Sequence, residues 1–205
     1  MRFVINPRPS LPTEQTPPEG WHLIRQPTAR RGLLLSILVG LGLQLIPFAL
    51  LTLDSYLFPR IEPYSEADLS WWMLAPLILG SVVVHEALHL VMHPGGGMSG
   101  QSAVLIWPDK LRFGVMYEGW MSRERWLVMR LAPLAGLVVL PTLALMFDPS
   151  VIPYIWRQLL VLVILINALG AGGDLAASVI VARQAPRGAQ IGLWNGRACW
   201  RINQG

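Results

Sequence analysis

Residues 71–91 read WWMLAPLILGSVVVHEALHLV, and this stretch indicates both the fold and the chemistry of the chain. It is almost entirely apolar, and about 20 consecutive apolar residues are enough for a helix to cross the hydrocarbon core of a bilayer. The stretch therefore predicts a transmembrane helix. Near its end lie His85, Glu86 and His89. Ionisable groups are costly inside a membrane and usually belong to a functional site, so we expect the chemistry on this helix.

Three further segments have the length and apolar character of membrane-spanning helices. They cover about residues 32–53, with Pro47 as an expected kink, 127–147 and 154–181. Glycines at positions 170, 172 and 173 interrupt the last segment, and without a Cβ they allow either close helix contact or local unwinding. The chain is 53% hydrophobic and only 14% charged, which is a membrane-like composition. We therefore expect an all-α polytopic membrane protein with about four transmembrane helices.

The segment after residues 71–91 has a different character. Pro94 and the three glycines that follow it end the helix, and residues 102–107 and 111–117 then flank Pro108-Asp109-Lys110. This pattern predicts a small β-hairpin between the second and third helices, the alternative being a simple connector. Because open sheet edges cannot face lipid, we expect the hairpin at the cytoplasmic surface or inside a protein cavity.

Charge in the connections predicts the orientation of the helices, because Lys and Arg favour the cytoplasmic side. Residues 1–31 contain five Arg, and residues 182–205 contain four Arg and no acidic residue. The loop after the first helix instead holds Asp54, Arg60, Glu62, Glu66 and Asp68. We therefore expect three parts: a proline-rich cytosolic arm over 1–31, a membrane-embedded core over 32–181, and a basic cytosolic tail over 182–205. The polar arm does not resemble a cleaved signal peptide, so we expect the first helix to be retained.

The charge pattern and the cysteine count each exclude a kind of partner or site. The net charge is +4, but the basic residues flank apolar runs as orientation signals do, so we expect no nucleic-acid partner. Cys199 is the one cysteine, which excludes an intrachain disulfide and a cysteine-rich zinc site. Any metal must be held by His, Asp or Glu.

His85 and His89 have the spacing of two metal ligands on one helix. Four residues apart, their side chains share a face, with Cβ atoms within about 6 Å, and can bind one ion. Glu86 can accept a proton from a water molecule that the metal activates. Random placement of four His and seven Glu would give about 0.003 copies of His-Glu-x-x-His in this chain. The motif predicts a Zn²⁺ site with Glu86 as general base, the alternative being a structural polar cluster between helices.

A zinc site needs a third protein ligand and an open position for water. Asp174 is our candidate, because it is the one acidic residue within the other three predicted helices. Its alternative role is to cap a helix that starts after the glycines. His93 continues the four-residue series, but it lies about 12 Å along the helix from His85, too far to share the ion. We expect His93 to be a solvated histidine at the membrane interface.

These residues carry a resemblance to a known family. His85-Glu86-Ala87-Leu88-His89, Leu131-Ala132-Pro133-Leu134 and residues 167–174 (NALGAGGD) resemble the putative zincin peptidases, small bacterial membrane proteins related to the site-2 protease family of intramembrane zinc metalloproteases. In site-2 proteases an Asp in a late helix completes the zinc site, and a preceding Asn helps to position the substrate. The resemblance therefore implies Asp174 as a ligand and Asn167 as a substrate-positioning residue. Asn167 has an alternative role in an interhelical hydrogen bond.

Motif and resemblance together predict a membrane-embedded zinc metallopeptidase. It would hydrolyse a peptide bond of a membrane-associated or transmembrane protein near the cytoplasmic face, from a position in the bilayer of a bacterial inner membrane, with both termini cytoplasmic. The edge of the hairpin, near Tyr117, Glu118 and Gly119, could receive an extended substrate. Two alternatives are a non-catalytic zinc-binding scaffold or regulator and a metal transporter, although the chain shows no inverted repeat of the kind that transporters often have.

Overall fold

The computed structural model describes residues 1–5, 17, 19–57, 71–110, 112–147, 152–194 and 197–202. The chain forms two compact units. Unit 1 consists of Met1–Thr28, Glu86–Ala132 and Ala177–Gly205, and unit 2 consists of Ala29–His85 and Pro133–Ala176. Three of their four boundaries fall within continuous helices, so each of these helices contributes to both units. Arg60, Glu62, Glu66 and Asp68 of the charge analysis lie outside the described residues.

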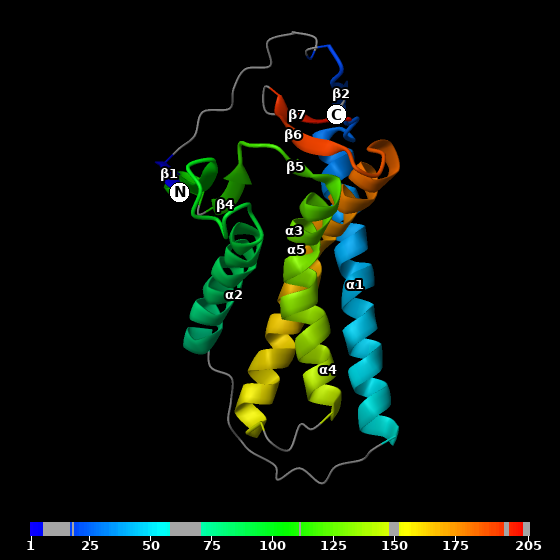
Figure 1. The fold of residues 1–205 in the computed structure, drawn as a ribbon. Helices are drawn as coiled ribbons and strands as arrows, with labels where there is room; N and C mark the ends of the chain where they lie inside the picture. Colours follow the sequence, from blue (N-terminus) through cyan, green and yellow to red (C-terminus); the bar gives the residue numbers. More distant parts are fainter. Residues whose placement is uncertain are drawn as a thin grey trace. The chain divides into compact units, whose positions relative to one another are not determined.

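The four predicted helices are all present (Figure 1). They are α1 (Ala29–Leu57), α2 (Trp71–Val91), a third helical run and α5 (Tyr154–Gln184). The third run consists of α3 (Arg123–Leu134), a π-helical segment η2 (Ala135–Val139) and α4 (Leu140–Phe147). Each of the four is long and apolar enough to cross a membrane.

Unit 2 is a helical bundle. Within it α1 and α4 run in the same direction and α5 in the opposite one (Figure 1). Its core contains Val138, Leu145, Ile164 and Ala168. The faces turned away from this core remain apolar: Leu33, Leu38 and Leu45 of α1 are 62%, 66% and 67% exposed. Large exposed apolar surfaces of this kind are typical of contact with lipid.

Helices α1 and α5 approach each other through glycine. A Cβ on Gly40 would lie 2.5 Å from the Leu169 carbonyl oxygen, and a Cβ on Gly172 would lie 2.5 Å from the Gly40 nitrogen. Gln44 Nε2 also donates a hydrogen bond to the Leu165 carbonyl, at 2.9 Å. The expected interruption of the last helix is therefore wrong, since α5 continues through Gly170–Gly173 without a break. The glycines instead serve the other expected purpose, close contact between helices.

Prolines explain the irregular third run. The π-helical segment η2 lies between Pro133 in α3 and Pro141 in α4. A proline inside a helix has no N–H to donate, and its ring pushes against the carbonyl four residues earlier. Widening the helix to a π-turn makes room for that ring, and the Leu140 N–H accordingly bonds to the Ala135 carbonyl, five residues back.

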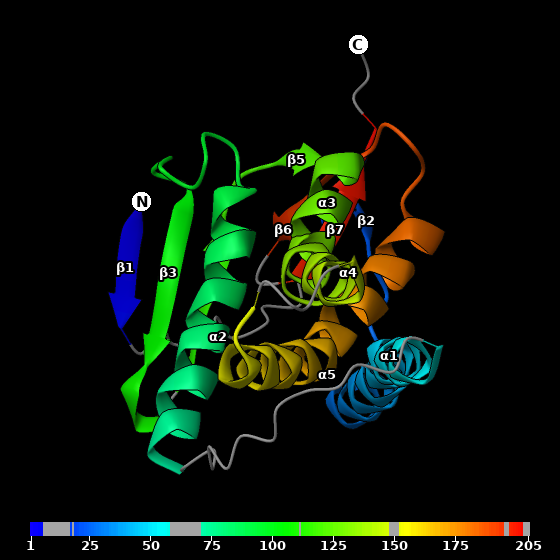
Figure 2. The ribbon, with the colours of Figure 1, turned by 90° about the horizontal axis from the view of Figure 1, so that it is seen from below.

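Unit 1 contains two small sheets. The first has the order β1-β3-β4, in which β1 (Arg2–Ile5) lies parallel to β3 (Ser102–Trp107), and β3 is antiparallel to β4 (Arg112–Tyr117). Figure 2 shows β1 beside β3. A short 3₁₀ turn, η1 (Pro108–Lys110), joins β3 to β4. The predicted hairpin is thus confirmed, with its turn at the predicted residues.

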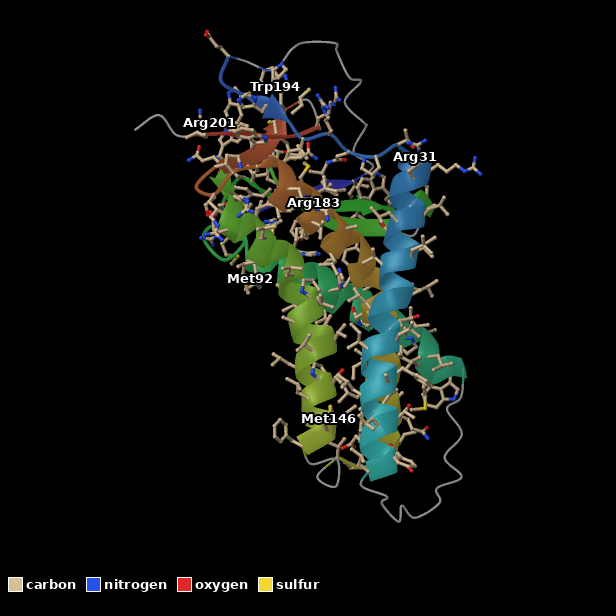
Figure 3. The ribbon with its side chains drawn as sticks, turned by 90° about the vertical axis from the view of Figure 1, so that its right-hand side faces the viewer. Arg31, Met92, Met146, Arg183, Trp194 and Arg201 are labelled. Atoms are coloured by element: carbon tan, nitrogen blue, oxygen red, sulfur yellow. The ribbon has the colours of Figure 1, made fainter. Side chains whose placement is uncertain are left out.

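The second sheet was not predicted. Its order is β2-β7-β6-β5, built from β2 (His22–Leu23), β5 (Met121–Ser122), β6 (Gln190–Trp194) and β7 (Arg197–Arg201). Figure 3 labels Trp194 on β6 and Arg201 on β7. Ile24, Val181, Ile191 and Ala198 lie in the core of this unit. The all-α fold class is therefore too narrow, because segments of the expected arm and tail pair as strands.

Candidate metal centre

His85 of α2 lies between two polar side chains of α5. Its Nε2 is 3.1 Å from Asp174 Oδ2, and its Nδ1 is 3.3 Å from Asn167 Oδ1. The Asn167 amide nitrogen donates to the Val163 carbonyl at 2.8 Å, which turns the amide oxygen toward His85. Because an amide oxygen only accepts, His85 Nδ1 carries the proton in this contact. Nε2 is then the nitrogen that faces Asp174.

His89, one turn further along α2, is held in the same way by a different acceptor. Its Nδ1 lies 2.8 Å from the backbone carbonyl oxygen of Met129 in α3. A carbonyl only accepts, so His89 Nδ1 is also the protonated nitrogen. With the proton on Nδ1, Nε2 is in each ring the nitrogen that would bind a metal.

The donor set fits a zinc ion. One ligand atom each from His85, His89 and Asp174 lies within 4.8 Å of the other two. Two ligands at about 2.0–2.2 Å from a tetrahedral zinc are themselves roughly 3.3–3.6 Å apart, slightly more than the 3.1 Å between His85 Nε2 and Asp174 Oδ2. Asp174 and His89 are 7% and 5% exposed, so this donor set is largely shielded from solvent.

Glu86 follows His85 and is partly accessible. Its Oε2 accepts a hydrogen bond from the Val115 N–H of β4, at 3.0 Å. This N–H cannot also pair with β3, so Val115 presents its backbone polar groups to the outer edge of the strand. Gly114, the preceding residue, lies close by: a Cβ there would be 3.8 Å from the same carboxylate oxygen. The part of β4 that lies beside Glu86 is therefore Val115. The expected substrate edge near Tyr117, Glu118 and Gly119 stays a prediction.

His93 differs from its prediction. It is 1% exposed, not solvated, and its Nδ1 lies 3.2 Å from Ser102 Oγ. Burial lowers the pKa of His93 to about 4, and the neighbouring charges of His89, Arg130 and Arg125 contribute to the same shift. Arg125 also donates to the Met92 and His93 carbonyls, at 3.1 and 2.9 Å, and so stabilises the end of α2. His93 is therefore a neutral, buried residue that packs just after the C-terminal end of α2.

Sequence reasoning named His85, His89 and Asp174, and the structure brings them together. Asp174 does not cap a helix, because it lies inside α5. The alternative role of Asn167, an interhelical hydrogen bond, is confirmed, with His85 as its partner.

Sequence reasoning missed the Met129 carbonyl. A signal for it exists, because Pro133, four residues later, has no N–H to donate to this carbonyl. Asp54 was placed in a loop, but it lies within α1 and is buried.

One of the comparisons with known proteins identifies the family of the chain. A sequence model of the family described as "Putative zincin peptidase" matches residues 78–189, a range that includes the His-Glu-x-x-His motif, the hairpin and Asp174. No curated protein and no solved structure matches the chain. The match covers more than half of the sequence, and the chain belongs to the Putative zincin peptidase family.

Proposed function

We propose that this protein is a membrane-embedded zinc metallopeptidase that hydrolyses a peptide bond of a membrane-associated substrate near the cytoplasmic face. The observation that carries the proposal is the contact of His85 Nε2 with Asp174 Oδ2 at 3.1 Å, with His89 on the next turn and Glu86 beside the first ligand. Family membership supports peptide hydrolysis as the reaction class. A relation in plan to the site-2 proteases is part of the proposal.

Each polar residue of the site then has a role. His85, His89 and Asp174 hold Zn²⁺, which when bound lowers the pKa of water and polarises the scissile carbonyl. Asn167 Oδ1 accepts a hydrogen bond from His85 Nδ1–H and so orients this ligand, in addition to any contact with substrate. Glu86 is the general base that takes a proton from the attacking water and passes it to the leaving amine.

The hairpin suggests how the substrate is held. In the order β1-β3-β4, strand β4 has β3 on one side, and Val115 faces the other side with its N–H bonded to Glu86. An extended peptide added to this edge would run past the carboxylate that acts as base. Strand addition also supplies the unwound chain that cleavage requires, since a helical peptide bond is shielded by its own hydrogen bonds. Membrane substrates would have to unwind locally to reach it.

The first experiment replaces the base by its isosteric amide. Full-length protein is purified, reconstituted into liposomes with a library of membrane-anchored fluorogenic peptides, and assayed for cleavage and for bound zinc. We expect Glu86→Gln to keep one zinc per chain, because the amide oxygen can still accept from Val115. We expect cleavage to fall by about 10²–10⁴-fold, the usual contribution of a general base.

Ligand loss is tested with a matched pair of buried aspartates. Asp174 and Asp54 are both 7% exposed and both lie in unit 2. Asp174→Asn should lose zinc, whereas Asp54→Asn should retain it. If wild-type protein binds zinc stoichiometrically but cleaves none of the anchored peptides, the non-catalytic scaffold is favoured. Zinc uptake into the liposomes would favour the transporter.

A further inference from the structure

Pro133 lies inside the third helical run and is among the largest fully buried side chains. In an α-helix the N–H of each residue bonds to the carbonyl four residues earlier. Pro133 has no N–H, so the helix supplies no such donor to the carbonyl of Met129. That carbonyl is the one that accepts His89 Nδ1–H, at 2.8 Å. The proline and the histidine contact thus concern the same oxygen.

We propose that Pro133 is a positioning residue for the metal ligand His89. By withholding an N–H from Met129, it keeps this carbonyl available as the acceptor for His89 Nδ1–H. The acceptor fixes the tautomer and the orientation of the ring, so that Nε2 points away from α3. The inference rests on the proposed zinc site and assigns a residue that supports it without touching the metal.

Without the proline, a backbone N–H at position 133 would compete with His89 for the Met129 carbonyl. A residue with an amide at position 133 would offer an intrahelical donor aligned with the Met129 oxygen. His89 would then share the acceptor or turn away from it, and its second tautomer, with Nε2 protonated, would become populated. Ring orientation by an outer partner is worth about 10–100-fold in metal affinity at histidine sites.

Pro141 provides a control in the same helical run. It too has no N–H for the carbonyl four residues earlier, that of Leu137, two turns beyond Met129. Both positions lie beside the π-helical segment η2, so both substitutions relax a similar local distortion. Only the Pro133 substitution returns an N–H to the acceptor of His89.

The test compares Pro133→Ala with an alanine-like residue that has no N–H. Lactic acid, introduced at position 133 by nonsense suppression, replaces the amide by an ester and lacks the proline ring. Zinc affinity of the purified full-length chain is measured by competition with a chelator, and the His89 tautomer by ¹⁵N chemical shifts. We expect Pro133→Ala to weaken zinc binding about 10–100-fold and to populate the Nε2–H tautomer. The lactate variant and Pro141→Ala should match the wild type.

The outcomes separate this inference from the function on which it rests. Wild-type affinity in Pro133→Ala would overturn the role of Pro133 while leaving the zinc site intact. Equal weakening in the alanine and lactate variants would overturn it too, because the ring and not the missing N–H would then be responsible. A wild-type chain that binds no zinc would overturn the proposed site itself.

Discussion

His85 and His89 reach the same state through unlike acceptors. One ring donates to the side-chain amide of Asn167 and the other to a backbone carbonyl, so Nδ1 is the protonated nitrogen in both. Asn167 can do this only because its own amide nitrogen is engaged by Val163, which prevents the amide from turning over. In the proposed zinc site these hydrogen bonds fix the orientation of the two histidine ligands. Losing one of them should therefore weaken zinc binding, although neither acceptor touches the metal.

His93 gives a prediction for stability against pH. Its pKa is about 4 in the folded chain and 6.5 in the unfolded chain. Between these values the unfolded state binds a proton that the folded state does not, so stability falls as pH drops from about 6.5 to 4 and this contribution levels off below. The total is on the order of 3 kcal/mol. The measurement is the melting temperature in detergent, at fixed zinc, for the wild type and His93→Gln.

The difference between the two proteins isolates the histidine, because carboxylates contribute equally to both curves. The wild type should lose more stability than His93→Gln over this range. Parallel curves would show that His93 is accessible to protons in the folded state, contrary to its burial against Ser102 and beside the charges of Arg125 and Arg130.

At the scale of elements, the contact of α1 with α5 carries the residues of the site. Asn167, Asp174 and Gly172 belong to α5, and Gly40 on α1 lies against Leu169 and Gly172. Packing in lipid depends on close backbone approach, since water no longer drives apolar helices together. A small increase in side-chain volume at this contact should therefore destabilise the packing of α1 against α5.

Two glycines of α1 test this directly. A Cβ on Gly40 would lie 2.5 Å from the Leu169 carbonyl, whereas a Cβ on Gly42 would meet nothing within 4 Å. Gly40→Ala should lower the unfolding free energy by about 1–3 kcal/mol, the usual cost of overpacking. Gly42→Ala should leave it unchanged or raise it slightly, because alanine is the better helix former. Steric-trap or denaturant unfolding in detergent micelles would measure both, and equal effects would argue against a tight contact at Gly40.

At the scale of the whole molecule, four helices and the distribution of Arg lead us to expect both termini and the hairpin on the cytoplasmic side. Figure 3 shows Arg31 extending from α1 at the end where that helix begins. Cysteines are introduced one at a time as Met98→Cys, at a residue that is 77% exposed, and as Ser65→Cys, next to Glu66 in the sequence. In intact cells an impermeant maleimide should label position 65, and should label position 98 only after permeabilisation. The reverse pattern would invert the orientation.

The sequence alone was enough for the four helices, the hairpin turn and the His-Glu-x-x-His motif. These features depend on neighbours in the chain: a long apolar run, a Pro-Asp-Lys turn between two β-prone segments, and ligands four residues apart on one helix. Asp174 could be named as well, because an acidic residue in an apolar helix is rare enough to stand out. Its contact with His85, 89 residues away in the chain, is seen only in the tertiary structure.

Only the tertiary structure decided what those residues touch. The pairing of Arg2 with Ala103 and of His22 with Trp200 joins short strands far apart in sequence, and no local pattern specifies such partners. Burial of His93 depends on Ser102 and Arg125, and orientation of His85 depends on an amide 82 residues away. The local sequence determines which polar groups are buried and therefore need a hydrogen-bond partner. The identity of that partner depends on how distant segments pack against one another, and the order of residues in the chain does not specify this.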